Sequence, residues 1–167
     1  DRANALAVDL VLISGDLFDS NRVTEETVER AVQEISRLSM SAVILPGNHD
    51  QLDDNSVYHR VDLGHMAHLI TDTDGEQVDF PDLDLVVWGR AMEEHSPQFH
   101  PLEGVPSRNS QAWHIGMAHG FHFSTGDYPD RSSPIFPEDI ASTKYDYLAL
   151  GHVHMFRDVS VGEVRAF

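Results

Sequence analysis

Acidic, amide and imidazole side chains recur in four short motifs along this chain. The motifs are Gly-Asp-Leu-Phe-Asp at residues 15–19, Gly-Asn-His-Asp at 47–50, His119, and Gly-His-Val-His at 151–154. Carboxylates, amide oxygens and imidazoles are ligands for divalent metal ions. Each motif directly follows an apolar run, so each ligand is expected at the end of a strand. The pattern predicts a metal site, and its chemistry would be metal-dependent phosphoester hydrolysis.

The first two motifs offer oxygen ligands and one imidazole. The Asp16 carboxylate has two oxygens and can bridge two cations, although an Asp after Gly is commonly no more than a turn residue. Asn48 supplies a neutral carbonyl oxygen, and a protonated His49 beside it could donate to a leaving oxygen. The alternative interpretation of this pair is a turn Asn followed by a solvent-exposed His.

The last two motifs supply imidazoles. A lone His at a strand end, such as His119, is more often structural, so its weight comes from the other motifs. His152 and His154 would face opposite ways on an extended segment. At a strand-to-turn junction, however, both can reach adjacent metals, and Gly151 permits close backbone approach.

The elements before the first two motifs form one unit. Residues 8–13 and 41–45 are short apolar runs that predict buried strands. Between them, residues 21–40 predict an amphipathic helix with Thr24 as its N-cap. Strand, helix and strand make a βαβ unit, so the two strands are expected to be parallel neighbours.

The rest of the chain predicts more strands separated by long loops. Strands are expected at 67–71, 113–118, 145–150 and 159–167, with a hairpin formed by 77–80 and 83–88. Short helices are expected at 56–63 and 135–142, and long loops at 91–110 and 121–137. Trp88 and Trp113 are expected in the core. Long loops after strands are where an open α/β sheet places its active site.

Composition narrows the chemistry and the partners. The chain has 167 residues and no Cys, which excludes thiolate metal sites and leaves Mn, Fe, Zn or Mg as candidates. Eleven Lys and Arg against 28 Asp and Glu give a net charge of −17, which argues against broad, non-specific nucleic-acid binding. Bound cations would reverse the local field for a phosphoester. Without a long apolar run or a signal-peptide pattern, a cytoplasmic protein with no membrane partner is expected.

The four motifs and their order resemble the calcineurin-like metallophosphoesterase superfamily over about residues 8–154. Residues 11–20 and 145–154 are most similar to its DNA-repair exonuclease (SbcD-like) branch. The resemblance implies an α/β fold, a layered β-sandwich flanked by helices (α-β-β-α). It also implies two divalent cations, with Mn favoured and Fe, Zn or Mg as alternatives, and an in-line attack on phosphorus.

The resemblance also implies roles for individual residues. Asp16 resembles the bridging carboxylate, and the further ligands are Asn48, His119 and His152 for the second metal and His154 for the first. His49 resembles the catalytic His that assists the leaving group, and Asp19 and Asp50 resemble residues that orient the ligands. The other histidines match no motif and are expected to be structural, although His122, near His119, could touch substrate.

The family's opening Asp-x-His motif, which ligates the first metal, does not occur before Asp16. Residues 1–167 are therefore interpreted as a single metallophosphoesterase domain that is incomplete at both termini and lacks its first strand. Such a fragment is expected to bind at most one cation well and to have little activity. It would also expose an apolar strand edge.

Three functions are compatible with the sequence. The first is a two-metal phosphodiesterase, a DNA exonuclease in its full form, with DNA as substrate and, if SbcD-like, a homodimeric or ATPase partner. The second is the same chemistry on a small nucleotide or phosphomonoester. The third is a non-catalytic phosphoesterase-like scaffold, which the retention of His49 and the later motifs argues against.

Overall fold

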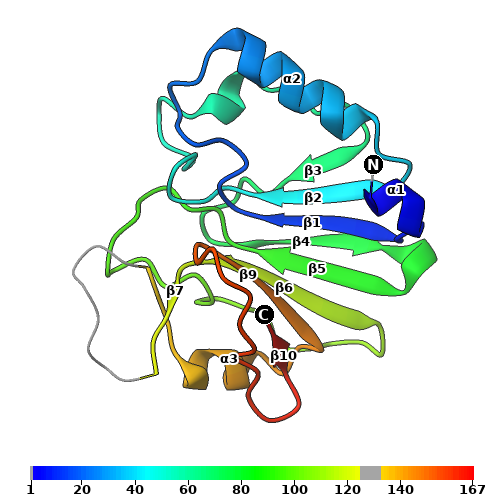
Figure 1. Ribbon diagram of the computed structural model, residues 1–167. Coiled ribbons are helices and arrows are strands. Elements are labelled where there is room, and N and C mark those ends of the chain that lie inside the picture. The colour runs from blue at the N-terminus through cyan, green and yellow to red at the C-terminus, as the bar shows by residue number, and fades with distance from the viewer. Residues whose placement is uncertain (1, 125–132) are drawn as a thin grey trace.

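The computed structural model describes residues 2–124 and 133–167, and it is built in four layers (Figure 1). Helix α2 (Glu25–Ser36) covers a three-stranded sheet, which faces a five-stranded sheet. Helix α3 (Pro137–Thr143) lies on the far side of the second sheet. The α-β-β-α arrangement that the sequence predicts is therefore confirmed.

The three-stranded sheet contains the predicted βαβ unit. Its order is β1 (Leu10–Ser14), β2 (Ser41–Leu45) and β3 (Ala67–Leu69), and all pairings are parallel. Helix α2 connects β1 to β2, and the hydroxyl of its N-cap, Thr24, accepts a hydrogen bond from the Thr27 amide at 3.4 Å. The helix is shorter than the predicted 21–40, because Arg37 already caps it by donating to the Glu34 and Ile35 carbonyls.

The five-stranded sheet is mixed. Its order is β10 (Arg165–Ala166), β9 (Tyr147–Gly151), β6 (Trp113–His119), β5 (Leu85–Gly89) and β4 (Glu76–Phe80). The predicted hairpin is confirmed, since β4 and β5 are antiparallel and are joined through the short helix η2 (Pro81–Leu83). The other pairings are parallel, which brings the carboxyl ends of β6 and β9 together.

Three apolar clusters hold the layers together. Strand β2 shows how, because its side chains alternate between the faces of the sheet. Ile44 packs with Val28 and Ile35 of α2, whereas Val43 and Leu45 pack against the five-stranded sheet. A third cluster, which includes Ile140, lies between that sheet and α3.

Two further predictions need correction. The segment 121–137 is not all loop, because β7 (Phe121–His122) pairs in parallel with β8 (Pro134–Ile135), while residues 125–132 lie outside the described part. Trp88 is buried as predicted, but Trp113 is 63% exposed. Trp113 stands at the first residue of β6, where it lines a groove beside β1 instead of filling the core.

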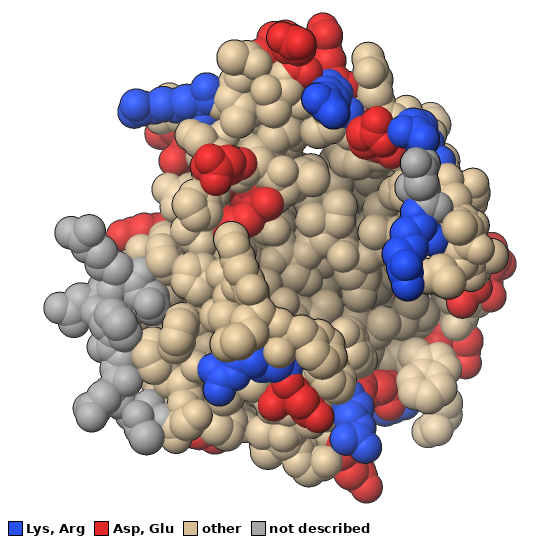
Figure 2. Space-filling model, in the orientation of Figure 1, with Lys and Arg blue, Asp and Glu red and all other residues tan. Residues whose placement is uncertain are grey.

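The groove borders the outer edge of β1. Among the described residues, β1 pairs with β2 alone, and its other edge faces the groove. Figure 2 shows this side of the molecule, with charged side chains around the rim and few across the middle. The remaining helices are α1 (Arg2–Leu6) and η1 (Val57–Arg60), and none of the helices that the structure describes is long and apolar enough to cross a membrane.

Candidate metal centre

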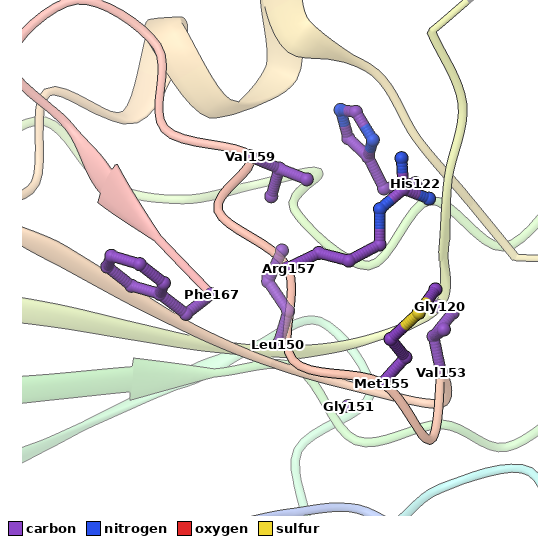
Figure 3. A pocket seen from close by; sticks show the side chains of 9 residues that line it. All are labelled: Gly120, His122, Leu150, Gly151, Val153, Met155, Arg157, Val159 and Phe167. Carbon is purple, nitrogen blue, oxygen red and sulfur yellow. The ribbon is translucent and has the colours of Figure 1, made fainter.

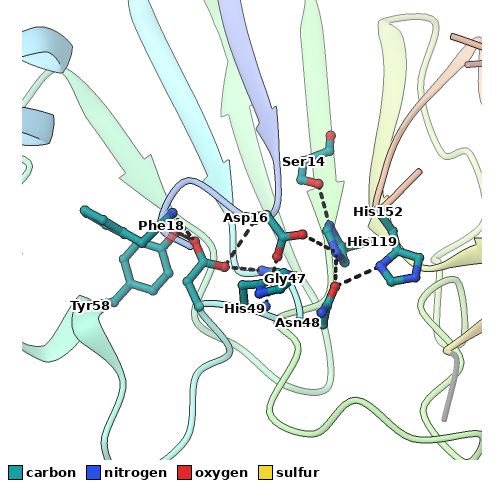
Figure 4. Close-up of polar contacts among 10 residues, drawn as sticks. Ser14, Asp16, Phe18, Gly47, Asn48, His49, Tyr58, His119 and His152 are labelled. Carbon is teal, nitrogen blue, oxygen red and sulfur yellow. Dashed lines mark hydrogen bonds and ion pairs between the residues drawn. The ribbon is translucent and has the colours of Figure 1, made fainter. Parts of the chain in front are cut away.

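The predicted ligands gather where parallel strands of the two sheets end. Asp16 follows β1, Asn48 follows β2, His119 ends β6 and His152 follows β9 (Figure 4). The two sheets are linked beside this point, since the Ser14 hydroxyl donates to the Ala149 carbonyl at 3.0 Å. The fold therefore brings together side chains that are more than 100 residues apart.

Three of these side chains form a cluster that can hold a metal ion. One ligand atom each of Asp16, His119 and His152 lies within 4.8 Å of the others. Asn48 joins them, because its Oδ1 lies 2.9 Å from His119 Nε2 and 2.8 Å from His152 Nδ1. Two oxygen donors and two imidazoles fit a divalent cation of the Mn, Fe, Zn or Mg type.

The protonation of His119 explains why a cation suits this point. Its Nδ1 lies 2.8 Å from the Ser14 carbonyl oxygen, which can only accept, so Nδ1 carries the proton. The other ring nitrogen, Nε2, faces two oxygens, Asn48 Oδ1 at 2.9 Å and Asp16 Oδ2 at 3.3 Å. With Nε2 deprotonated, these three atoms would offer electron pairs to the same point, and a bound cation would remove the repulsion between them.

Two glycines make room for this ring. A Cβ added to Gly15, which has φ +90°, would overlap the His119 imidazole. A Cβ added to Gly151 would overlap the Ser14 carbonyl oxygen that orients the same ring. These close approaches explain why glycine precedes both Asp16 and His152.

Asp50 holds the two ligand loops in place. Its carboxylate is completely buried and accepts backbone hydrogen bonds from Asp16 at 3.2 Å, Phe18 at 3.0 Å and Gly47 at 2.7 Å. The Tyr58 hydroxyl donates a fourth at 2.7 Å, and burial together with the Asp50 charge raises the pKa of that phenol. Asp50 thus fixes the backbone at Asp16, whose φ of +56° is unusual for a residue with a side chain.

The Asp16 carboxylate is kept ionised by its neighbours. Burial alone would raise its pKa. The hydrogen bond from His119 and the His49 amide, which donates at 2.9 Å, have the larger opposite effect, so the pKa falls from 3.8 to about 2. An anionic ligand is therefore available to a cation at all physiological pH values.

His152 is kept neutral. Burial lowers the pKa of His152 to about 4, and the neighbouring imidazoles of His119 and His95 lower it further. The ring makes edge-to-face contacts with His119, at 5.2 Å between centroids, and with His95, at 5.3 Å. A neutral imidazole is the form that binds metals.

The structure places the other predicted site residues outside the cluster. His49 is exposed next to Asp16, with its backbone amide bonded to that carboxylate. His154 and Asp19 are exposed, and neither has a hydrogen bond or ion pair within residues 2–124 and 133–167. The roles of His49, His154 and Asp19 thus stay predictions.

One residue near the cluster was expected to be merely structural. His95, in the loop after β5, packs its ring on His152, and its Nε2 is buried without a hydrogen-bond partner in the described part of the chain. No motif spacing marks this position, and only its place in a long loop after a strand could have indicated it.

A layered fold with a cluster of possible metal ligands at its strand ends is the arrangement that the sequence motifs predict. Residues 1–156 match the calcineurin-like phosphoesterase family, and the chain belongs to this family. Over 153 residues it is 24% identical to a protein of Bacillus subtilis (strain 168) named as the uncharacterized metallophosphoesterase YhaO. The matched region covers 88% of this chain and 37% of that protein, so the chain spans little more than a third of its relative's length.

Proposed function

We propose that this chain is the catalytic domain of a phosphodiesterase that uses Asp16, Asn48, His119 and His152 to bind a divalent cation, Mn in the first instance. The observation that carries the proposal is the convergence of these four ligands on one point. A cation bound there would act as a Lewis acid on the phosphoryl oxygens and would activate water.

The residues of the chain then have distinct tasks. His119 and His152 hold their rings in fixed orientations, and Asp50 keeps the Asp16 carboxylate aimed at the same point. His49 is exposed beside Asp16, where its imidazole can reach a bound ester and donate a proton to the leaving oxygen. His154 and a second cation complete the proposed two-metal site.

These 167 residues assayed alone are expected to be slow. Within them, the first metal position has Asp16, which is shared, and His154 as its protein ligands. We therefore propose that one cation binds more tightly than the second.

A DNA exonuclease of the SbcD-like branch is the first candidate for the whole protein, on the strength of residues 11–20 and 145–154. The acidic surface favours a second candidate, a phosphoesterase for small nucleotides. On the face in Figure 2, basic side chains are separated by acidic ones and form no continuous stripe. A comparison of the rates of hydrolysis of DNA ends and of mononucleotide esters distinguishes the two candidates.

Hydrolysis of bis(4-nitrophenyl) phosphate with Mn tests the proposal. We expect activity that a chelator removes, that Asp16→Asn abolishes, and that His49→Asn lowers about 100-fold in kcat, the range of general acid catalysis. Asp54→Asn is the matched control, because Asp54 is exposed on the loop after the site. Metal-independent activity, or equal loss in Asp16→Asn and Asp54→Asn, would refute the assignment.

A further inference from the structure

A small pocket lies beside the ends of β6 and β9, next to the metal centre (Figure 3). Its volume is about 50 Å³, enough for a group the size of a few water molecules. Gly120 and Gly151, the neighbours of His119 and His152, form part of its wall. The rest of the lining comes from His122, Leu150, Val153, Met155, Arg157, Val159 and Phe167.

The His122 imidazole lines this pocket, and its hydrogen-bonding capacity is not satisfied by the described residues. Both ring nitrogens are buried, and neither has a hydrogen-bond partner in residues 2–124 or 133–167. The preceding residue, Phe121, packs against the His152 ring at 6.3 Å between centroids. Since successive side chains on a strand face opposite ways, His122 is directed away from the metal cluster.

Arg157 supplies a second hydrogen-bond donor to the lining of this pocket. Figure 3 shows its side chain extended toward the His122 imidazole. Arg60, Arg90 and Arg108 each form an ion pair with a carboxylate, but Arg157 forms none within the described residues. Arg157 is exposed, so its guanidinium and the His122 imidazole are together accessible to a ligand at the mouth of the pocket.

We propose that this pocket binds a phosphate group of the substrate other than the one that is hydrolysed, so that the preferred substrate carries at least two phosphates. The inference rests on the proposed phosphoesterase function. A guanidinium pairs with phosphate through two parallel hydrogen bonds, and a neutral imidazole adds a third. His122 follows His119 by three residues across a bend at Gly120, so about 10 Å is the upper limit for the distance between their Cα atoms and sets the scale of the separation between the two phosphates.

The first experiment titrates orthophosphate into chelator-treated protein and follows binding by ³¹P NMR. We expect saturable binding that weakens about tenfold or more in Arg157→Gln, as for the loss of a charged hydrogen bond. Arg30→Gln, an exposed arginine on α2, is the control with the same change in charge and should bind like the parent. His122→Gln should also weaken binding, and thermal unfolding verifies that each variant is folded. Equal phosphate affinity in the parent and in both pocket variants overturns the proposal.

The second experiment compares kcat/KM of the Mn-loaded enzyme for a dinucleotide with and without a 5′-phosphate. We expect about a tenfold preference for the phosphorylated form, lost in Arg157→Gln and kept in Arg30→Gln. Hydrolysis without preference overturns the inference but leaves the proposed function intact. No hydrolysis of either substrate refutes the proposed function, while phosphate binding in the first experiment is unaffected. Phosphate binding without substrate preference assigns the pocket to free phosphate and contradicts the substrate role.

Discussion

The inner and outer sides of the metal centre differ in how firmly the fold holds their side chains. On the inner side, the His119 ring is 2% exposed and its tautomer is set by the Ser14 carbonyl. On the outer side, His49 and His154 are exposed, and their rings have no hydrogen-bond partner among the described residues. The inner side is preorganised to bind an ion before any substrate arrives, whereas the outer side must be ordered by the ligand that it meets.

The difference follows from where each residue stands in the fold. His119 ends a central strand that is paired on both sides, so the sheet fixes its backbone. His154 lies two residues beyond His152, after β9 has ended. The motifs therefore determine which residue types are available as ligands, whereas the sheet determines how rigidly each side chain is held.

Removal of the Asp50 carboxylate is expected to have the largest effect. Asp50→Ala leaves three backbone amides and the Tyr58 hydroxyl without their acceptor. At about 1–3 kcal/mol for each unsatisfied buried group, the loss of unfolding free energy should be at least about 4 kcal/mol in urea denaturation. Asp19→Ala, at an exposed position on the loop after β1, should change it by less than about 0.5 kcal/mol. Similar losses in the two variants would remove the distinction between the inner and outer sides.

The next effect is on metal affinity. His119→Gln deletes an inner ligand, and we expect at least about 100-fold weaker Mn binding by calorimetry, since loss of a group that merely orients a ligand already costs 10–100-fold. His154→Gln should weaken binding of the first equivalent of Mn less than about threefold. An equal loss from His154→Gln would show that the outer side is as well ordered as the inner one.

His95 supports the inner side of the metal centre without belonging to the cluster. His95→Gln removes the ring that packs on His152, and Mn affinity should fall about tenfold. His65→Gln, at an exposed histidine without a hydrogen bond in the described part, is the matched control. An unchanged affinity would return His95 to the structural role that its sequence context suggested.

The smallest expected effect is on the pH dependence of stability. In chelator-treated protein the pKa of His152 is about 4 against 6.5 in the unfolded chain, so below pH 6.5 the unfolded state binds the additional proton. Stability should therefore fall as pH decreases from 6.5 to 4. His152 is half-exposed, which limits its share to about 1 kcal/mol. In His152→Gln, thermal unfolding should depend less steeply on pH in this window. An unchanged dependence of the unfolding temperature on pH would contradict the lowered pKa of a partly buried His152 ring.

Sequence alone predicted most of the fold and the four residues that lie together on the inner side. Periodicity and turn residues located β1, α2, β2 and the β4–β5 hairpin, because local pattern determines which face each side chain takes. Short strands such as β7 were not predicted, because two residues are too few to show a pattern. The exposure of Trp113 was not predicted, because it depends on the groove beside β1. His95 and Arg157 were not recognised as neighbours of the site, because tertiary contact alone brings them to it.

Anomalous diffraction at the manganese edge, from crystals soaked in Mn, tests the central claim most directly. We expect one strong peak bounded by Asp16, Asn48, His119 and His152, with at most weak density toward His154. The absence of a peak among these four side chains, or two sites of equal full occupancy, would contradict it.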